Sequence, residues 1–135
     1  MTFEIRGVVE GFYGPFYTFA QRQDMLRFLA ARGMNFYLYG PKNDRAHRAR
    51  WREGHGPEQL AGLARDVALA ADLGIRFGYA LSPVSMSYSS PADLALVRER
   101  FRMFYDMGVR DFALFFDDVA ARFQHSADAR HFGTF

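Results

Sequence analysis

The chain has 135 residues, half of them apolar, and its 15 Phe and 7 Tyr supply enough large side chains for the core of one compact domain. The formal charge of +2 is too small to indicate a nucleic-acid partner, and the absence of cysteine excludes a disulfide framework and a thiolate metal site. No apolar run is long enough to span a bilayer and no signal-peptide core is present, so we expect no membrane partner and favour the cytoplasm, although the compartment stays open.

Apolar segments and turn residues alternate along the chain in the order expected for repeated strand–helix units. We expect strands at residues 4–9, 35–39, 75–80 and 112–116. We expect helices at residues 18–33, 57–74 and 90–108, and a fourth helix starting at Ser126. The helix starts carry a Thr18–Gln21 capping box, Pro57, and Ser90 followed by Pro91. Units of about 30–40 residues fit right-handed crossovers between parallel strands, so the expected fold class is α/β.

The last of these strands ends in two adjacent carboxylates, Asp117 and Asp118. Its continuous apolar run predicts a strand that is buried on both faces, as in a parallel sheet. Ionised carboxylates are costly to bury without partners, so the pair belongs at the strand's exit. There it either lines the mouth of a pocket or serves as a helix cap or a solvated turn, and the local sequence leaves both alternatives open.

Unusual residues follow all four expected strands. They are Glu10, Gly11 and Tyr13; Lys42 and Asp44; Ser82 and Pro83; and Asp117 and Asp118. Because parallel strands bring their carboxyl ends to one side of the sheet, we expect these residues to converge on a common rim. This convergence, more than any single residue, favours a functional site.

Four strand–helix units are half of what a closed (β/α)8 barrel requires, which is about 200–250 residues. An open sheet of four parallel strands leaves backbone groups unpaired along its two edges. We therefore expect a (β/α)4 half of a TIM barrel whose edges are completed by a second copy, giving a homodimer, or by a complementary half-barrel chain.

The chain resembles the catalytic domain of family 84 glycoside hydrolases, the β-N-acetylglucosaminidases that include O-GlcNAcase. The resemblance covers essentially the whole chain and matches the first half of that family's TIM barrel, so we expect residues 1–135 to be the amino-terminal half. The matching segments are residues 6–15, 34–35, 37–39, 41–42, 51–52, 80–83, 108–110 and 112–118, together with His47.

The resemblance implies a role for each residue at the rim. Asp117 would orient and polarise the 2-acetamido group of the substrate, and Asp118 would be the general acid and then the general base. The Gly11 carbonyl and Lys42 would bind sugar hydroxyls, and we place Tyr13 in the same substrate-binding group. The implied substrate is an N-acetylglucosamine-containing glycoconjugate, cleaved with retention through the substrate's own carbonyl oxygen, without a metal or cofactor.

The spacing of the two acids suits this chemistry. A retaining glycosidase with a carboxylate nucleophile needs its two carboxyl groups about 5–5.5 Å apart across the sugar. Neighbouring residues have Cα atoms about 3.8 Å apart and are poorly placed to flank a sugar on two sides. Two close carboxylates also raise the proton affinity of one of them, which keeps an acid protonated near neutral pH.

Other features carry weaker or opposite indications. The four histidines lack zinc-site spacing, and the Arg-rich segment 45–52 is interpreted as a solvated loop anchored by Trp51 rather than a nucleic-acid site. Asn43 and Val84 depart from the family, which usually has an acid and a glycine there. The family's remaining sugar-binding residues come from strands five to eight and have no counterpart here. A catalytically inactive half-barrel, or a sugar-binding or assembly module, is therefore the alternative to an enzyme.

Overall fold

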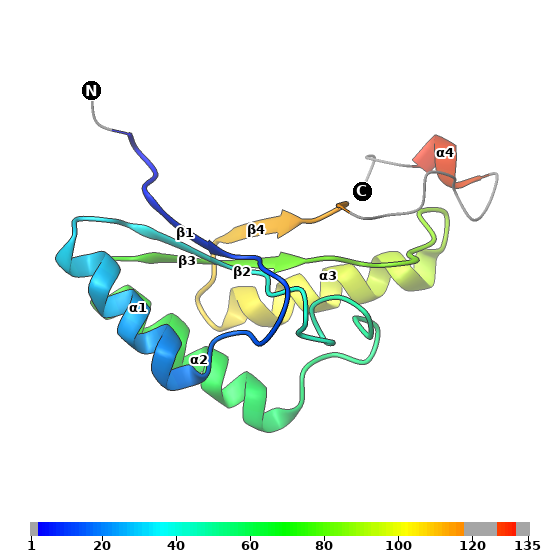
Figure 1. Ribbon diagram of the computed structural model, residues 1–135. Helices are drawn as coiled ribbons and strands as arrows, with labels where there is room; N and C mark the ends of the chain where they lie inside the picture. Colours follow the sequence, from blue (N-terminus) through cyan, green and yellow to red (C-terminus); the bar gives the residue numbers. More distant parts are fainter. Residues whose placement is uncertain (1–2, 118–126, 132–135) are drawn as a thin grey trace.

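The computed structural model describes residues 3–117 and 127–131 and contains a single parallel sheet with its three long helices on one face (Figure 1). The elements in chain order are β1 Gly7–Glu10, α1 Phe19–Ala31, β2 Phe36–Tyr39, α2 Pro57–Asp72, β3 Arg76–Leu81, α3 Pro91–Asp106, β4 Asp111–Leu114 and α4 Asp128–His131. The sheet order β1-β2-β3-β4 follows the chain, and every neighbouring pair is parallel. The predicted α/β class is confirmed, and the architecture is a (β/α)4 half of a TIM barrel.

The helix starts agree with the sequence signals. The Thr18 hydroxyl accepts from the Gln21 N–H while the Gln21 side chain accepts from the Thr18 N–H, which completes the capping box. Pro57 opens α2, and the Ser90 hydroxyl caps α3 by accepting from the Asp93 N–H. The predicted start of the fourth helix, Ser126, lies outside the described residues, and α4 is a single short turn.

The strand ends differ from the prediction because the neighbouring strand sets them. β1 begins at Gly7, which pairs with Phe36 at the start of β2, so residues 4–6 have no strand partner. β4 ends at Leu114 because its partner Leu81 is the last residue of β3. The expectation that this strand is buried on both faces is wrong. All four of its residues are half-buried, since it lies at the sheet's edge with helices on one face only.

The core lies between the sheet and the three long helices. Alternate residues of β2 and β3 point into it, and the Tyr79 ring stacks on Phe104 of α3 with ring centres 3.7 Å apart. The helices face the core with apolar residues, among them Leu26, Leu63 and Val97, which are buried. Stacked aromatic rings form a layer between the sheet and the helices: Tyr37, Tyr39, Phe77, Tyr79 and Phe104.

The opposite face of the sheet is not covered by any element that the structure describes (Figure 1). Val9 on this face is 54% exposed, and Ile5, just before β1, is 52% exposed. Smaller side chains continue the face on β3 and β4, where Ala80 pairs with Ala113.

Among residues 3–117 and 127–131, no helix has the length and apolar character needed to cross a membrane.

A buried ion network joins the sheet to the first two helices. Arg22 of α1 donates to Glu10 of β1 at 2.8 Å and to Asp66 of α2 at 3.0 Å, and all three side chains are at most 1% exposed. The Tyr37 hydroxyl donates to Glu10 at 2.6 Å, and the Tyr17 N–H donates to the other Glu10 oxygen at 3.0 Å. Because its charges are paired and hydrogen-bonded, the network fixes how α1 sits against β1 and α2.

We expect Arg22→Met to destabilise the fold by about 3–5 kcal/mol, because it leaves Glu10 and Asp66 buried without their counter-charge. Urea unfolding of the 135-residue chain measures the loss. The control is Arg27→Met on the same helix, whose pair with Asp24 is exposed and contributes little. Equal shifts of the unfolding midpoint in the two variants would contradict a stabilising role for the network.

Candidate active site

The exits of β2 and β4 meet through an ion pair between Lys42 and Asp117. The two residues are 75 positions apart in the sequence, and the Lys42 side chain is 7% exposed while that of Asp117 is 47% exposed. The ammonium group thus lies nearly enclosed beside a carboxylate that faces solvent. The expected convergence of Lys42 and the acid pair on one rim is realised for Asp117, and Asp118 lies outside the described residues.

Backbone hydrogen bonds join the neighbouring exits. The Gly40 N–H donates to the Glu10 carbonyl at 3.0 Å, and the Lys42 N–H donates to the Phe12 carbonyl at 3.2 Å. Gly11 lies between these two acceptors, so its backbone is held beside the segment that carries Lys42. The structure therefore places three of the predicted site residues, Gly11, Lys42 and Asp117, at the same end of the sheet.

Phe115 fills the space behind the ion pair. The Lys42 Nζ lies 5.0 Å from the centre of the Phe115 ring, a cation–π arrangement. Gly40 makes this packing possible, because a Cβ at that position would lie 2.7 Å from the Phe115 ring. The ring thus limits where the ammonium group can sit.

The ion pair also favours the ionised form of Asp117. The hydrogen bond from Lys42 is the main cause that holds the pKa of this carboxyl below its ordinary value of 3.8, and the charges of Lys42 and Arg48 act in the same direction. Asp117 is therefore ionised at neutral pH and has only acceptor oxygens. It can accept an N–H from a ligand but cannot supply a proton.

Tyr13 lies at the same rim, after β1, and is 60% exposed. The Arg48 guanidinium lies 5.7 Å from the centre of its ring. Asn43, one of the departures from the family pattern, accepts from the Gly14 N–H through its side-chain oxygen at 3.2 Å. Asn43 thus ties the segment containing Tyr13 to the segment containing Lys42.

Glu10 and Asp44 were predicted at the rim, but both bond to groups on the helix side of the sheet. Glu10 belongs to the buried ion network, and Asp44 accepts from the Tyr39 hydroxyl at 2.6 Å and from Gln59 at 3.0 Å. The alternation of side chains along β1 contained a signal for this, because Glu10 shares a face with Val8, which packs on the core. Ser82 lies directly after β3 and is buried.

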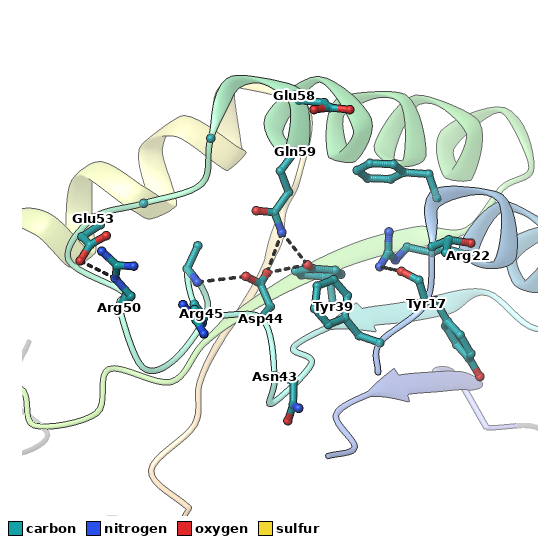
Figure 2. A pocket seen from close by; sticks show the side chains of 16 residues that line it. Tyr17, Arg22, Tyr39, Asn43, Asp44, Arg45, Arg50, Glu53, Glu58 and Gln59 are labelled. Atoms are coloured by element: carbon teal, nitrogen blue, oxygen red, sulfur yellow. Dashed lines mark hydrogen bonds and ion pairs between the residues drawn. The ribbon is translucent and has the colours of Figure 1, made fainter. Parts of the chain in front are cut away.

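A cavity of about 740 Å³ lies on the helix side of the same strand exits (Figure 2). Its lining includes Tyr39, Asp44 and Gln59, which bond to one another, but neither Lys42 nor Asp117. Figure 2 shows Asp44 held by Gln59 and Tyr39, so its oxygens are already occupied. The buried side-chain polar atoms that line this cavity all have hydrogen-bond partners.

The Arg-rich loop has the structural role predicted for it. Trp51 is buried and its indole N–H donates to the Val84 carbonyl at 3.0 Å, while Arg52 pairs with Asp93 of α3. Among the described residues, no group of three or more His, Asp or Glu side chains is arranged to hold a metal ion.

Comparisons with known proteins agree with these features. The model of the NAGidase family, described as beta-N-acetylglucosaminidase, matches residues 6–134. The proteins named Protein O-GlcNAcase from Rattus norvegicus and Mus musculus are each 38% identical over 114 residues, which is 84% of this chain and 12% of each relative. A solved mutant of the Thermobaculum terrenum O-GlcNAc hydrolase matches with a TM-score of 0.90 and 38% identity, over 95% of this chain and 28% of that one. The chain therefore spans only a small part of these relatives.

We expect Lys42→Met to raise the pKa of Asp117 toward 3.8, because the substitution removes the main group that favours the ionised form. A pH titration of the side-chain carboxyl carbon by NMR measures the change. The direction of the accompanying change in stability follows from the linkage between protonation and folding. A depressed pKa stabilises the fold above the unfolded-state value, and this contribution is lost as pH falls through the folded-state value.

Arg50→Met is the matched control for this titration. Arg50 is in the same loop and pairs with Glu53 at an exposed position, so its removal leaves the pKa of Asp117 unchanged. An unchanged pKa in Lys42→Met would show that the pair does not form in solution.

Proposed function

Because the chain belongs to the β-N-acetylglucosaminidase family, glycoside hydrolase family 84, we propose that residues 1–135 form the amino-terminal half of a retaining, substrate-assisted glycosidase barrel. The proposed substrate is an N-acetylglucosamine-containing glycoconjugate, with protein-linked O-GlcNAc the class that the relatives' names indicate. The observation that carries the proposal is the ion pair between Lys42, after β2, and Asp117, after β4 and immediately before Asp118 in the sequence.

In the first step, Asp117 accepts the N–H of the 2-acetamido group. This contact increases the electron density on the acetamido carbonyl oxygen, whose lone pair forms a bond to the anomeric carbon. The glycosidic bond breaks at the same time, and its electron pair goes to the leaving oxygen, which takes a proton from Asp118. The product is a cyclic oxazoline-type intermediate, and the Asp117 carboxylate stabilises the positive charge that develops near the nitrogen.

In the second step, the Asp118 carboxylate removes a proton from water as the water oxygen attacks the anomeric carbon. The bond from the carbonyl oxygen to that carbon breaks, and the acetamido group is restored. Each step inverts the anomeric carbon, so the overall result is retention. No carboxylate nucleophile is required, which suits two acids that are adjacent in the sequence.

The two carboxyl groups need opposite protonation states, and their surroundings can supply them. Lys42 holds Asp117 ionised, as its lowered pKa indicates. The resulting negative charge beside Asp118 disfavours a second ionisation and therefore favours a protonated acid there. The acid role that the family resemblance implies for Asp118 agrees with this difference, since an ionised Asp117 has no proton to donate.

The other rim residues suit recognition of the sugar. The ammonium group of Lys42 has three N–H donors, and its pair with Asp117 uses one of them. The remaining donors and the Gly11 carbonyl can bind sugar hydroxyls, and the exposed Tyr13 ring can cover an apolar face of the sugar. These contacts fix the ring so that the acetamido group reaches Asp117.

A second candidate is a half-barrel that binds sugar or assembles without turnover. The open face of the sheet favours it, because Val9 and Ile5 remain exposed where a closed barrel would bury its interior. Under our main proposal, this face is completed by the other four strand–helix units or by a second copy of the chain. The two candidates differ in whether a complete pocket can form.

We expect Asp118→Asn to lower kcat/KM by about 10²–10⁴-fold toward an alkyl β-N-acetylglucosaminide, because the poor leaving group needs a proton. Toward a dinitrophenyl β-N-acetylglucosaminide the first step needs little acid assistance, so its rate falls far less. The measurement uses this chain together with a chain that supplies strands five to eight.

Asp117→Asn provides the comparison in the same assembly. It slows both substrates, because assistance by the acetamido group is needed whatever the leaving group is. Equal sensitivity of the two substrates to Asp118→Asn would contradict the acid role of Asp118, and full activity in Asp117→Asn would contradict the role of Asp117.

We also expect the 135-residue chain alone to associate through its open face and edges, with a scattering mass above the 15.5 kDa of the monomer at micromolar concentration. Val9→Lys, on the uncovered face, reduces this mass. Ala61→Lys, at an exposed position of the central helix α2, does not. A monomer with the unmodified sequence would contradict the expected self-association.

A further inference from the structure

His47 is a fully buried histidine in the loop between β2 and α2, and the roles proposed above do not use it. Its Nδ1 lies 2.6 Å from the carbonyl oxygen of Ala80 in β3. A carbonyl oxygen only accepts, so Nδ1 carries the proton in this contact. The other ring nitrogen, Nε2, is buried and has no hydrogen-bond partner among the described residues.

The backbone of His47 makes a second link to the same strand. Its carbonyl oxygen accepts from the Ser82 N–H at 3.0 Å, directly after β3. The end of β3 is in turn joined to the exit of β4, because the Phe115 N–H donates to the Leu81 carbonyl at 2.8 Å. His47 thus connects the loop that carries Lys42, through β3, to the segment that carries Asp117.

The ring of His47 also packs against the group that lies behind the ion pair. Its centre is 5.9 Å from that of Phe115, in an edge-to-face arrangement. Phe115 in turn lies under the Lys42 ammonium group. A Cβ on Gly40 would come within 3.3 Å of the His47 ring as well as 2.7 Å of Phe115, so the cluster has little spare room.

We propose that His47 is a positioning residue that holds Lys42 and Phe115 so that the ammonium group stays on Asp117. The hydrogen bond to Ala80 anchors the lysine loop, and the ring edge fixes the Phe115 ring that limits the ammonium position. The link to catalysis rests on the function proposed above, whereas the link to the ion pair does not.

The surroundings keep this histidine neutral. Burial lowers the pKa of His47 to about 4, with Lys42 acting in the same direction and the Ala80 hydrogen bond and Asp44 opposing it. A proton on Nε2 would add a buried donor to an atom that has no partner among the described residues. Above pH of about 4 the neutral ring with its proton on Nδ1 is therefore the form that bonds Ala80.

The test compares His47→Leu with His47→Asn in the 135-residue chain. Asparagine can place a side-chain N–H near the position of Nδ1, whereas leucine has no donor. We expect His47→Leu to raise the pKa of Asp117 toward 3.8, measured on its carboxyl carbon by NMR, and His47→Asn to leave that pKa close to the value in the unmodified chain.

His55→Leu is the matched control. His55 is buried in the same loop but contacts Tyr79 and Phe104 on the helix side of the sheet. It should lower stability without moving the pKa of Asp117. An unchanged pKa in His47→Leu, or equal shifts in His47→Leu and His55→Leu, would overturn the proposal.

A measurement on the unmodified chain covers the case in which His47→Leu does not fold. Nitrogen–proton correlation NMR of the His47 ring at pH 7 should show a neutral ring protonated on Nδ1. A ring protonated on Nε2, or on both nitrogens, would overturn the proposal.

In the assembly with strands five to eight, His47→Leu should lower kcat/KM by about 10–100-fold, since small displacements of catalytic groups carry such losses. His47→Asn should recover most of that activity. If the pKa of Asp117 shifts as expected while the unmodified assembly hydrolyses nothing, the proposed function fails and the positioning role stands. If hydrolysis occurs but the pKa does not shift, the positioning role fails alone.

Discussion

The parallel register of four short strands is the constraint on which the rest of this structure depends. Each strand is the hydrogen-bonding partner of the next in the chain, so every strand exit falls on the same end of the sheet. Lys42 and Asp117 follow strands that are separated by β3. They meet because the registers of β2 and β4 on β3 fix where both strands end. A change of pairing by one residue would turn the core face of a strand outward and separate this pair.

The charged groups near the strand exits lie in two different environments. Glu10 points toward the helices, where Arg22 and Tyr37 satisfy it, and its function there is structural. Lys42 and Asp117 lie beyond the strand ends, where one partner is enclosed and the other faces solvent. A buried, fully paired carboxylate has no capacity left for a ligand, whereas an ionised and half-exposed one does. The same kind of ion pair therefore stabilises the fold in one place and, under the proposed function, prepares a site in the other.

Much of the fold could be predicted from the sequence because its signals are local. The Thr18 capping box and the prolines at the starts of α2 and α3 define helix starts through contacts within one turn. The ends of β1 and β4 could not be predicted in this way, since they depend on where β2 and β3 begin and end. Local signals thus give the order of the elements, and pairing gives their limits.

The residues of the candidate site also differ in whether local sequence signals could predict their roles. The motif around Asp117 and the position of Lys42 after a strand were enough to predict that they meet. The structural role of Asp44 was missed because its partner Gln59 lies in the next helix. His47 matched the family pattern and was an unlikely metal ligand, but its positioning role was not predicted, since its bond to Ala80 spans 33 positions and leaves no local trace.

The uncovered face of the sheet lies next to the rim that carries Lys42 and Asp117. Near the strand exits this face is built from small residues: Ala80 pairs with Ala113, and a Cβ on Gly40 would lie 3.1 Å from Ala80. The space between Gly40 and the Lys42 ammonium group holds one aromatic ring. Phe115 is the large side chain that enters this space, and His47 and Gly40 together determine where its ring lies. On the proposed function, the strands that complete the barrel over this face also complete the pocket at the rim.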